Sequence, residues 1–211
     1  MKKIISLLLI LCSLCTIVSA EYKSEADALN RLGLFKGTEN GYELERLFTR
    51  AEGATMLVRL MGMEEEALSK SYSNVFDDME NHWAQSYVMY CYENNITKGT
   101  GDAAFSPENE MTAAEYLTLV LRALGYENAE PENAHHAAAA LLLASSGELR
   151  DIMQIGFTRD KMVHVSYRAL KVKNTDDIML IETLADSGAV DEDVAMELGL
   201  FEEKELVIEF D

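Results

Sequence analysis

A short motif that begins helices recurs in this chain and constrains its fold more than any other feature. The tetrapeptide Thr-Arg-Ala-Glu, and further along Thr-Ala-Ala-Glu, stands directly before an apolar stretch. A threonine followed three residues later by glutamate is a capping box, in which each side chain satisfies a free backbone N–H of the first helical turn. The pattern predicts two helices whose boxes consist of Thr49 with Glu52 and of Thr112 with Glu115.

A third copy of the motif is weaker. Thr158 again precedes a helical pattern of apolar residues, but Asp160 and Lys161 stand where the other copies have alanine and glutamate. The three threonines are unequally spaced along the chain. One supersecondary unit that recurs at unequal spacing indicates repeats separated by insertions.

Each capped stretch follows an amphipathic segment and a loop, so the recurring unit is a helix, a loop and a capped helix. Apolar residues at helical spacing support this, as in the stripe Ala54, Leu57, Val58 and Met61. We therefore expect a mainly α fold with a short helical tail. The expected helices cover residues 24–32, 49–62, 82–93, 112–124, 134–144, 158–170, 176–187 and 191–198, with a short acidic helix or linker at 64–73, a loop around 145–156 and a strand-like alternation at 205–210.

The first twenty residues have the composition of a secretion signal. Two lysines precede an apolar run at residues 4–18, and Val18-Ser19-Ala20 forms a small-residue cleavage site. The run is shorter than the roughly 20 residues that a membrane-spanning helix needs. Cys12 and Cys15 each follow leucine, where a lipoprotein signal prefers a small residue, so a cleaved signal is favoured over a lipid anchor. We expect no transmembrane segment after cleavage.

Composition excludes several classes of function. The net charge is −19, and a chain so acidic repels phosphates, which argues against nucleic acid as a partner but leaves a local pocket for a small anion open. Cys91 is the only cysteine after the signal, so we expect a buried thiol and no internal disulfide.

Enzymatic and metal sites are also not indicated. The glutamates of the capping boxes suit helix capping better than a glycosidase carboxylate pair. His135 and His136 are adjacent and cannot chelate in the usual i, i+4 manner, and the acids near Asp77 and Asp78 lack the spacing of a calcium loop. We therefore expect no catalysis, no cofactor and no metal.

Four motifs, one of them the Thr-Arg-Ala-Glu box, carry a family resemblance. They are Phe-Asp-Asp followed by His-Trp-Ala at 76–84, Ile-Thr-Lys-Gly at 96–99, Phe-Ser-Pro at 105–107 and the Thr-Arg-Ala-Glu box. Together with LVLRALGY, SYRAL and LIETLADSGAV downstream, they resemble the S-layer homology module, a surface-anchoring module of bacterial cell envelopes. The resemblance is to a clostridial-type triple module and covers about residues 24–190. It implies a signal at 1–20, repeats at 21–73, 74–128 and 129–173, the last degenerate, and an acidic closing segment at 174–211.

The resemblance also implies an architecture and a ligand. Three helix–loop–helix prongs would pack around a pseudo-threefold axis, with the capped helices as a central bundle. Grooves between the prongs would bind a secondary cell-wall polysaccharide, often one that carries ketal-linked pyruvate. The arginine of the box and the tryptophan of His-Trp-Ala are the family's usual ligand contacts, which correspond to Arg50, Arg159 and Trp83 in this sequence.

The chemistry of these residues agrees with such a ligand. An arginine at the first position of a helix combines a planar fork for a carboxylate with free backbone N–H groups. An aromatic face such as Trp83 can cover a sugar ring, and Lys98, Gly99 and Thr100 supply a tight loop that can approach a ligand. The alternatives are solvated arginines at the first turn, a packing role for Trp83 and an ordinary surface loop around Lys98.

Departures from the family pattern leave a second function open. The second box has Ala113 in place of arginine, and the first repeat lacks His-Trp-Ala. At most two arginine-bearing sites are therefore expected, at Arg50 and Arg159. The leading hypothesis is a secreted wall-binding module at the cell surface. The alternative is a protein–protein adaptor or surface-layer assembly subunit that has lost sugar binding and whose partners are other surface-layer proteins.

Overall fold

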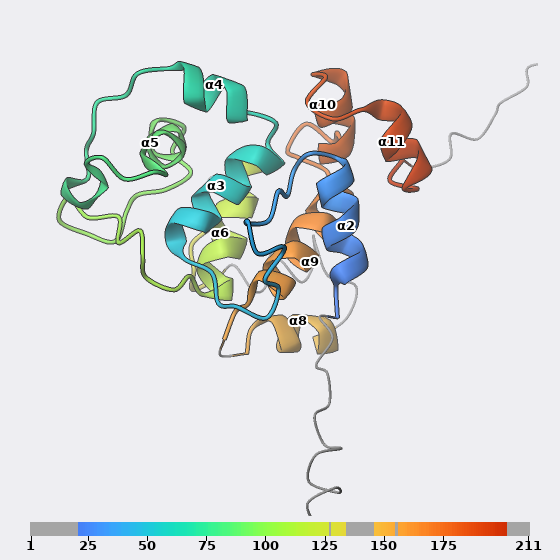
Figure 1. Cartoon of the computed structure of the whole chain (residues 1–211), viewed down its shortest axis with the longest axis horizontal. Coiled ribbons are helices and arrows are strands. Elements are labelled where there is room, and N and C mark those ends of the chain that lie inside the picture. Colours follow the sequence, from blue (N-terminus) through green and yellow to red (C-terminus); the bar gives the residue numbers. More distant parts are fainter. Residues whose placement is uncertain (1–20, 127, 134–145, 155, 202–211) are drawn as a thin grey trace, which may run out of the picture.

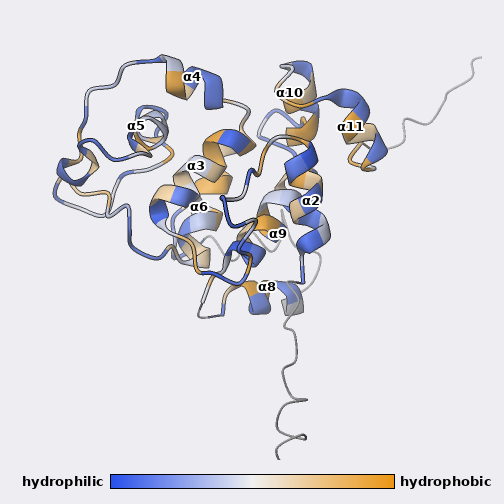
Figure 2. Ribbon diagram, viewed as in Figure 1, coloured by the Kyte–Doolittle hydropathy of each residue, from blue (hydrophilic) through white to orange (hydrophobic). Residues whose placement is uncertain are grey.

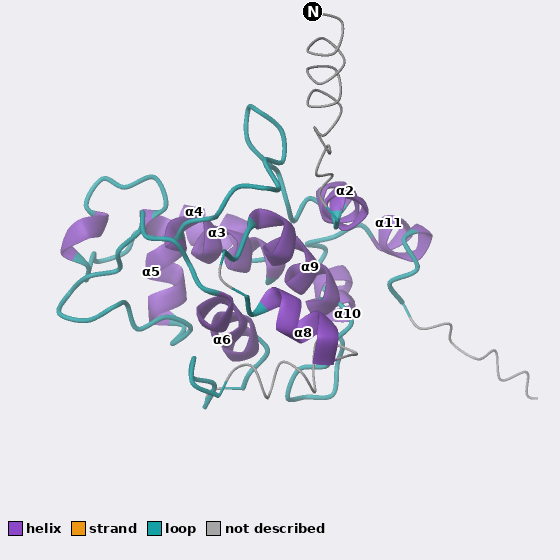
Figure 3. Cartoon of the chain, turned by 90° about the horizontal axis from the view of Figure 1, so that it is seen from below, coloured by secondary structure: helices purple, strands orange, loops and turns teal. Residues whose placement is uncertain are grey.

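A computed structural model describes residues 21–126, 128–133, 146–154 and 156–201. The regular elements in this part of the chain are helices, which confirms the mainly α fold (Figure 3). They are α2 (Lys23–Arg31), α3 (Arg50–Leu60), α4 (Glu64–Ser69), the 3₁₀ turn η2 (Asp77–Met79), α5 (Gln85–Glu93), α6 (Ala113–Ala123), α8 (Ser146–Ile152), α9 (Arg159–Ala169), α10 (Leu180–Asp186) and α11 (Glu192–Glu197). The expected signal, the helix at 134–144 and the strand at 205–210 lie outside the described residues.

The three helices with threonine caps occupy the middle of the molecule. Figure 1 shows α3, α6 and α9 together, with α4 and α5 on one side, α2 on the other and α10 with α11 at the C-terminal end. Helix α6 contacts both α3 and α9, α2 packs on α9, and α5 packs on α3. Each of these helices carries hydrophobic and hydrophilic residues together (Figure 2), as helices that bury one face do.

The residue before each cap anchors its helix in the core. Phe48, Met111 and Phe157 precede the three threonines and are at most 3% exposed. The rings of Phe48 and Phe157 lie 5.3 Å apart, and both contact the buried ring of Tyr116, at 5.5 and 5.9 Å. The starts of the three capped helices therefore converge on one aromatic cluster.

The capping predictions are confirmed. In both complete boxes the threonine side chain accepts from the glutamate N–H and the glutamate accepts from the threonine N–H, at Thr49 with Glu52 and at Thr112 with Glu115. Thr158 caps α9 through a longer bond from the Lys161 N–H, at 3.5 Å. Lysine at that position cannot return the bond, so the third cap is one-sided.

Two predicted helix starts are wrong. Helix α2 begins at Lys23 rather than at residue 24, and its N-cap residue Tyr22 makes no side-chain hydrogen bond. Helix α5 begins at Gln85 rather than at residue 82, because the N–H of Ala84 donates to the Nδ1 atom of His82 and holds these residues in a turn.

Two segments in the second half also differ from the prediction. Part of the loop expected around 145–156 is helix α8, which Ile152 anchors in the core with 1% exposure. Helix α10 begins at Leu180 rather than at residue 176. There the Oδ1 atom of Asn174 accepts from two backbone N–H groups, and Asp177 has a φ of 64°, which is left-handed and not helical.

Cys91 is fully buried, and burial raises the pKa of its thiol to about 12. The prediction of a buried thiol is confirmed. Within the described ranges, no helix is both long enough and apolar enough to cross a membrane.

A buried histidine connects the outer helices to α9. His164 on α9 is 5% exposed, and its two ring nitrogens lie 2.8 Å from Glu25 of α2 and 2.6 Å from Glu148 of α8. The ring also stacks on Tyr22 at 4.0 Å. Two carboxylates on opposite nitrogens are satisfied together only by the doubly protonated imidazolium.

This arrangement predicts a dependence of stability on pH. Burial lowers the pKa of His164, but hydrogen bonds and charge from Glu25 and Glu148 outweigh it and raise the pKa above 6.5. A pKa raised by folding contributes stability that is fully present below the unfolded value and is lost as pH rises through the folded value. The stability advantage of the wild type over His164→Gln should therefore shrink as pH rises above 6.5. Thermal unfolding of both proteins across this pH range measures the difference. A constant difference between the two proteins across this range would contradict the charged pairing.

Candidate functional site

The first junction joins residues 49–52, at the start of α3, to residues 105–115, before and within α6. The backbone N–H of Arg50 donates to the carbonyl oxygen of Asn109 at 2.9 Å, and the next N–H donates to Pro107 at 3.0 Å. These are N–H groups that a helix cannot satisfy within its own first turn. The loop that precedes α6 thus completes the first turn of α3, and this fixes the loop beside Arg50.

The side chain of Arg50 crosses the same junction. Its Nε donates to the carbonyl oxygen of Phe105 at 2.9 Å, and its Nη1 donates to Glu115 at 2.6 Å. The guanidinium also lies over the Phe105 ring, 4.9 Å from its centre. Arg50 is 6% exposed, so the alternative of a solvated arginine is wrong. Burial lowers its pKa, and the charge of Glu115 partly offsets this.

The second junction repeats this arrangement between residues 158–161, at the start of α9, and residues 42–52 of the first repeat. The N–H of Arg159 donates to the carbonyl oxygen of Arg46 at 2.9 Å, and the next N–H donates to Leu44 at 2.9 Å. The loop that precedes α3 therefore completes α9, as the loop that precedes α6 completes α3.

The arginine of the second junction has the same set of partners as Arg50. The Nε of Arg159 donates to the carbonyl oxygen of Tyr42 at 2.8 Å, its Nη1 donates to Glu52 at 3.0 Å, and its guanidinium lies 5.2 Å from the centre of the Phe35 ring. Arg159 is 5% exposed, so it too is not a solvated arginine. In each junction the arginine at the start of one capped helix bonds the capping-box glutamate of another, Arg50 with Glu115 and Arg159 with Glu52.

The box positions of α6 and α9 cannot form such a pair. Ala113 stands at the arginine position of α6, and Lys161 stands at the glutamate position of α9. The two helices pack together, but both partners of the ion pair are replaced. The two departures from the motif, Ala113 and Lys161, therefore both fall on the same contact and remove the ion pair that α6 and α9 would otherwise form.

The family motifs of the second repeat build its loop. Both oxygens of Asp78 accept backbone N–H groups, from Phe105 at 2.9 Å and from Ser106 at 2.7 Å. The Phe76 ring packs 5.7 Å from the Phe105 ring. Gly99 has a φ of +78°, and a Cβ there would stand 2.5 Å from both the Ala104 oxygen and the Phe76 ring. These contacts hold in place the carbonyl group that receives Arg50.

The structure brings only some of the predicted site residues together. Thr100 lies beside the first junction, because its Oγ1 bonds the hydroxyl of Ser106 at 2.9 Å. Trp83 is 58% exposed, so the packing alternative for this residue is wrong, and its neighbour His82 bonds Glu108 of the junction loop at 2.8 Å. Lys98 instead pairs with Glu130 at 2.6 Å, and Arg159 belongs to the second junction.

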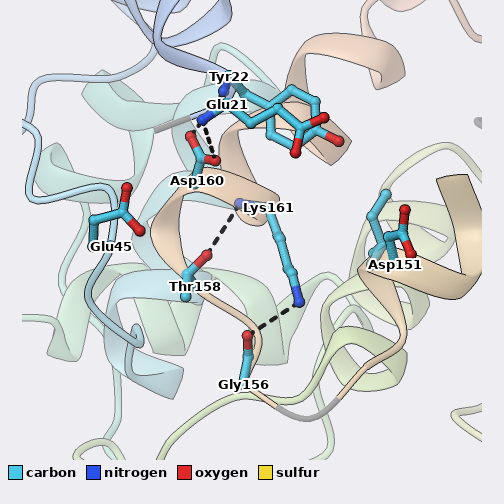
Figure 4. Close-up of a pocket in the computed structure, with 9 residues that line it drawn as sticks. Glu21, Tyr22, Glu45, Asp151, Gly156, Thr158, Asp160 and Lys161 are labelled. Atoms are coloured by element: carbon cyan, nitrogen blue, oxygen red, sulfur yellow. Dashed lines mark hydrogen bonds between the residues drawn. The ribbon is translucent and has the colours of Figure 1, made fainter. Parts of the chain in front are cut away.

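A pocket of about 270 Å³ lies at the start of α9. Figure 4 shows Glu45, Asp151 and Asp160 around it, with the Lys161 ammonium directed to the Gly156 carbonyl oxygen at 3.3 Å. Its lining carries more acidic than basic side chains, which makes it unfavourable for an anionic polymer.

Sequence reasoning missed one element of this architecture. Lys36-Gly37-Thr38 in the first repeat matches Lys98-Gly99-Thr100 in the second. Both glycines have positive φ, +69° and +78°, and both threonines bond a carbonyl oxygen further along the loop, at 3.1 and 3.2 Å. The identical tripeptide was a signal that could have aligned the two loops.

The two junctions join loops to the starts of capped helices on a mainly α scaffold, and comparison with known proteins shows what part of this chain resembles. The family model for the S-layer homology domain matches residues 75–117. Residues 75–117 of this chain are therefore similar to an S-layer homology domain. The match includes Trp83, residues 98–100 and the second box, whereas Arg50 and Arg159 lie outside it.

Proteins similar to this chain include cell-wall and surface proteins of bacteria. The Middle cell wall protein of Brevibacillus brevis is 38% identical over 112 residues, which cover 52% of this chain and 11% of that protein. The Surface layer protein of Brevibacillus choshinensis is 35% identical over 112 residues, 52% of this chain and 10% of that protein. The Cellulosome-anchoring protein of Acetivibrio thermocellus is 34% identical over 93 residues, 44% of this chain and 19% of that protein.

These matches cover between about a tenth and a fifth of each of those relatives. The domain and the relatives give this chain a secreted location at the cell surface, associated with the cell wall.

Proposed function

We propose that this chain is a non-catalytic module that attaches to a secondary cell-wall polysaccharide through the surface around the first junction. The observation that carries the proposal is the way Arg50 is held. Its Nε and Nη1 are bound by protein groups, while its Nη2 has no hydrogen-bond partner in the part of the chain that the structure describes. This leaves a fixed, directed donor for a carboxylate or hydroxyl group of a ligand.

The pairing of Arg50 with Glu115 shapes what such a site can recognise. Their charges cancel at short range, and the whole chain carries −19, so the junction exerts little long-range attraction on an anionic polymer. A carboxylate such as that of ketal-linked pyruvate would be held by directional hydrogen bonds. Binding should accordingly depend less on salt than binding by an unpaired basic patch.

Trp83 is the second component of the proposed surface. An indole that is 58% exposed beside the junction loop provides a flat apolar face for a sugar ring. Thr100 adds a hydroxyl group near the same loop, and Gly99 lets the loop pack closely against Phe76 and Ala104, which holds Thr100 in place. Lys98 would take part after leaving Glu130, an exposed pair that contributes little to stability.

The two junctions also support the arrangement that the sequence predicts. We propose that the three repeats are related by a pseudo-threefold axis, with equivalent junctions at Arg50 and Arg159 and a degenerate one between α6 and α9. Arg159 would offer a second ligand contact by the same geometry. The acidic pocket beside it favours the first junction as the main site.

A sedimentation assay with purified cell wall tests this function. Trp83→Ala should weaken binding to the wall by roughly five- to thirty-fold, because an aromatic contact contributes about 1–2 kcal/mol and 1.4 kcal/mol is a factor of ten. Leu68→Ala is the matched control, since Leu68 is a 54% exposed apolar side chain on α4. Equal retention of Trp83→Ala and wild type would overturn the assignment of Trp83.

Two further arms of the assay test the ligand and the arginines. Wall from which pyruvyl groups have been removed should retain less protein if the ligand is the pyruvylated polymer. The double variant Arg50→Lys with Arg159→Lys keeps both positive charges but removes the planar guanidinium fork, so it should bind the wall less than the wild type. Circular dichroism first checks that the variant is folded. Unchanged retention of the folded double variant would count against the arginines as contacts.

The second candidate is a protein–protein adaptor or surface-layer assembly subunit. The neutralised arginines favour it, because both are already paired with glutamates of a neighbouring repeat. Self-association in light scattering, without sedimentation on wall, would support this candidate against the first.

A further inference from the structure

The start of the described chain is held by a carboxylate of α9. The backbone N–H of Glu21 donates to Oδ2 of Asp160 at 3.0 Å, and that of Tyr22 donates to Oδ1 at 3.1 Å. Figure 4 shows both bonds entering the carboxylate from the same side. Asp160 therefore ties the segment that leads into α2 to the first turn of α9.

The carboxylate of Asp160 is buried without a cation. Asp160 is 8% exposed, and no lysine, arginine or histidine within the described ranges forms an ion pair with it. The adjacent Lys161 sends its ammonium to Gly156 instead. Burial raises the pKa of Asp160, and the N–H groups of Tyr22 and Glu21 only partly oppose this. A carboxylate in such a place is stabilised further by any positive charge that reaches it.

The sequence predicts where such a charge arises. The small-residue cleavage site Val18-Ser19-Ala20 ends directly before Glu21. Hydrolysis of the bond between Ala20 and Glu21 adds the hydroxyl group of water to the Ala20 carbonyl and leaves an amine on Glu21. This amine takes up a proton at neutral pH, because the ordinary pKa of an α-amino group is about 7.7–8.0.

We propose that removal of residues 1–20 creates an ion pair between the new α-ammonium group of Glu21 and the carboxylate of Asp160, which fastens α2 onto α9. The nitrogen already lies 3.0 Å from the carboxylate in the uncleaved arrangement, so charge is gained without a rearrangement. The protein thus reaches its full stability only after export and processing. This inference is independent of what the mature chain binds.

Lys161, which lines the same pocket, and His164, which stacks on Tyr22, oppose a positive charge at the new terminus, but the carboxylates around it outnumber them. Glu21 and Glu45 lie close enough to raise the pKa of Asp160, and Glu25 and Glu148 act on the neighbouring Tyr22. These carboxylates favour a positive charge. The folded chain should hold the amine protonated to a higher pH than the unfolded chain, so the added stability is present below about pH 7.7 and is lost as pH rises through the folded pKa.

The experiment compares two forms of the mature chain, one with Glu21 as a free amino terminus and one preceded by Gly-Ser-Gly. We expect the free terminus to unfold at a temperature several degrees higher at pH 6.5, and this advantage to shrink by pH 10. In the Asp160→Asn background the two forms should unfold together. Glu45→Gln is the matched control, since it removes a charge from the same pocket but leaves the carboxylate of Asp160 in place.

A direct titration covers the case in which Asp160→Asn does not fold. The pKa of the Glu21 amine, followed by NMR in the wild-type mature chain, should lie above 8. The proposal is overturned if this amine titrates in its ordinary range, if the extended form is as stable as the free terminus at pH 6.5, or if the advantage survives in folded Asp160→Asn.

Discussion

Replacing Arg50 with alanine should lower the free energy of unfolding by about 2–3 kcal/mol. The change removes the donors to the Phe105 carbonyl oxygen and to Glu115, and it leaves both acceptors in a largely buried junction. Breaking a fully buried ion pair by removal of one partner costs roughly 3–5 kcal/mol. The expected loss is smaller because the Glu115 side chain is 31% exposed, so water can solvate it. Denaturant unfolding measures the difference.

A double-mutant cycle separates the ion pair from the other roles of each residue. Glu115→Gln keeps most of the cap geometry of α6 but removes the charge that faces Arg50. If the two residues interact as the structure shows, the double variant should be more stable than the sum of the single losses predicts, by about 1 kcal/mol. Strictly additive losses would mean that Arg50 stabilises the junction only through Phe105.

Replacing Gly99 with alanine should be at least as damaging as the loss of Arg50, for a steric reason. An added Cβ would lie 2.5 Å from the Ala104 carbonyl oxygen and 2.5 Å from the Phe76 ring, both fixed parts of the loop. The φ of +78° adds the cost of placing a side chain in the left-handed region, about 1–2 kcal/mol. We expect a total loss of about 3–4 kcal/mol in denaturant unfolding.

Gly33 provides the matched control for this substitution. Its φ is +76°, almost equal to that of Gly99, but no heavy atom would lie within 4 Å of an added Cβ. Gly33→Ala should therefore lower the free energy of unfolding only by the cost of a side chain at positive φ, about 1–2 kcal/mol. If both variants lost the same stability, the contact of Gly99 with Ala104 and Phe76 would not be the cause.

The sequence was sufficient to predict the helices that begin with capping boxes. A capping box is a local device, readable from four residues and the apolar stripe behind them, and both complete boxes form as expected. Helix α8 was missed because its stability comes from distant contacts. The burial of Ile152 and the bond from Glu148 to His164 cannot be inferred from the residues of α8 alone.

The residues of the candidate site could be predicted from the sequence, but their hydrogen-bond partners could not. The motifs pointed to Arg50, Arg159 and Trp83, and the structure places Trp83 at the surface and both arginines at equivalent junctions. What the sequence did not reveal is that each arginine reaches the glutamate of another repeat's box. That partner is set by tertiary packing, 65 residues away for Arg50 and 107 residues away for Arg159.

Glu52 couples the formation of one helix to the docking of another repeat. Its single carboxylate caps α3 through the Thr49 N–H, bonds Arg46 in the preceding loop and receives Arg159 from the third repeat. The cap of α3 and the packing of α9 against it thus depend on the same Glu52 carboxylate. A fragment that contains α3 without α9 would therefore lose one of the bonds that hold Glu52 at its cap, and α3 and α9 should unfold together.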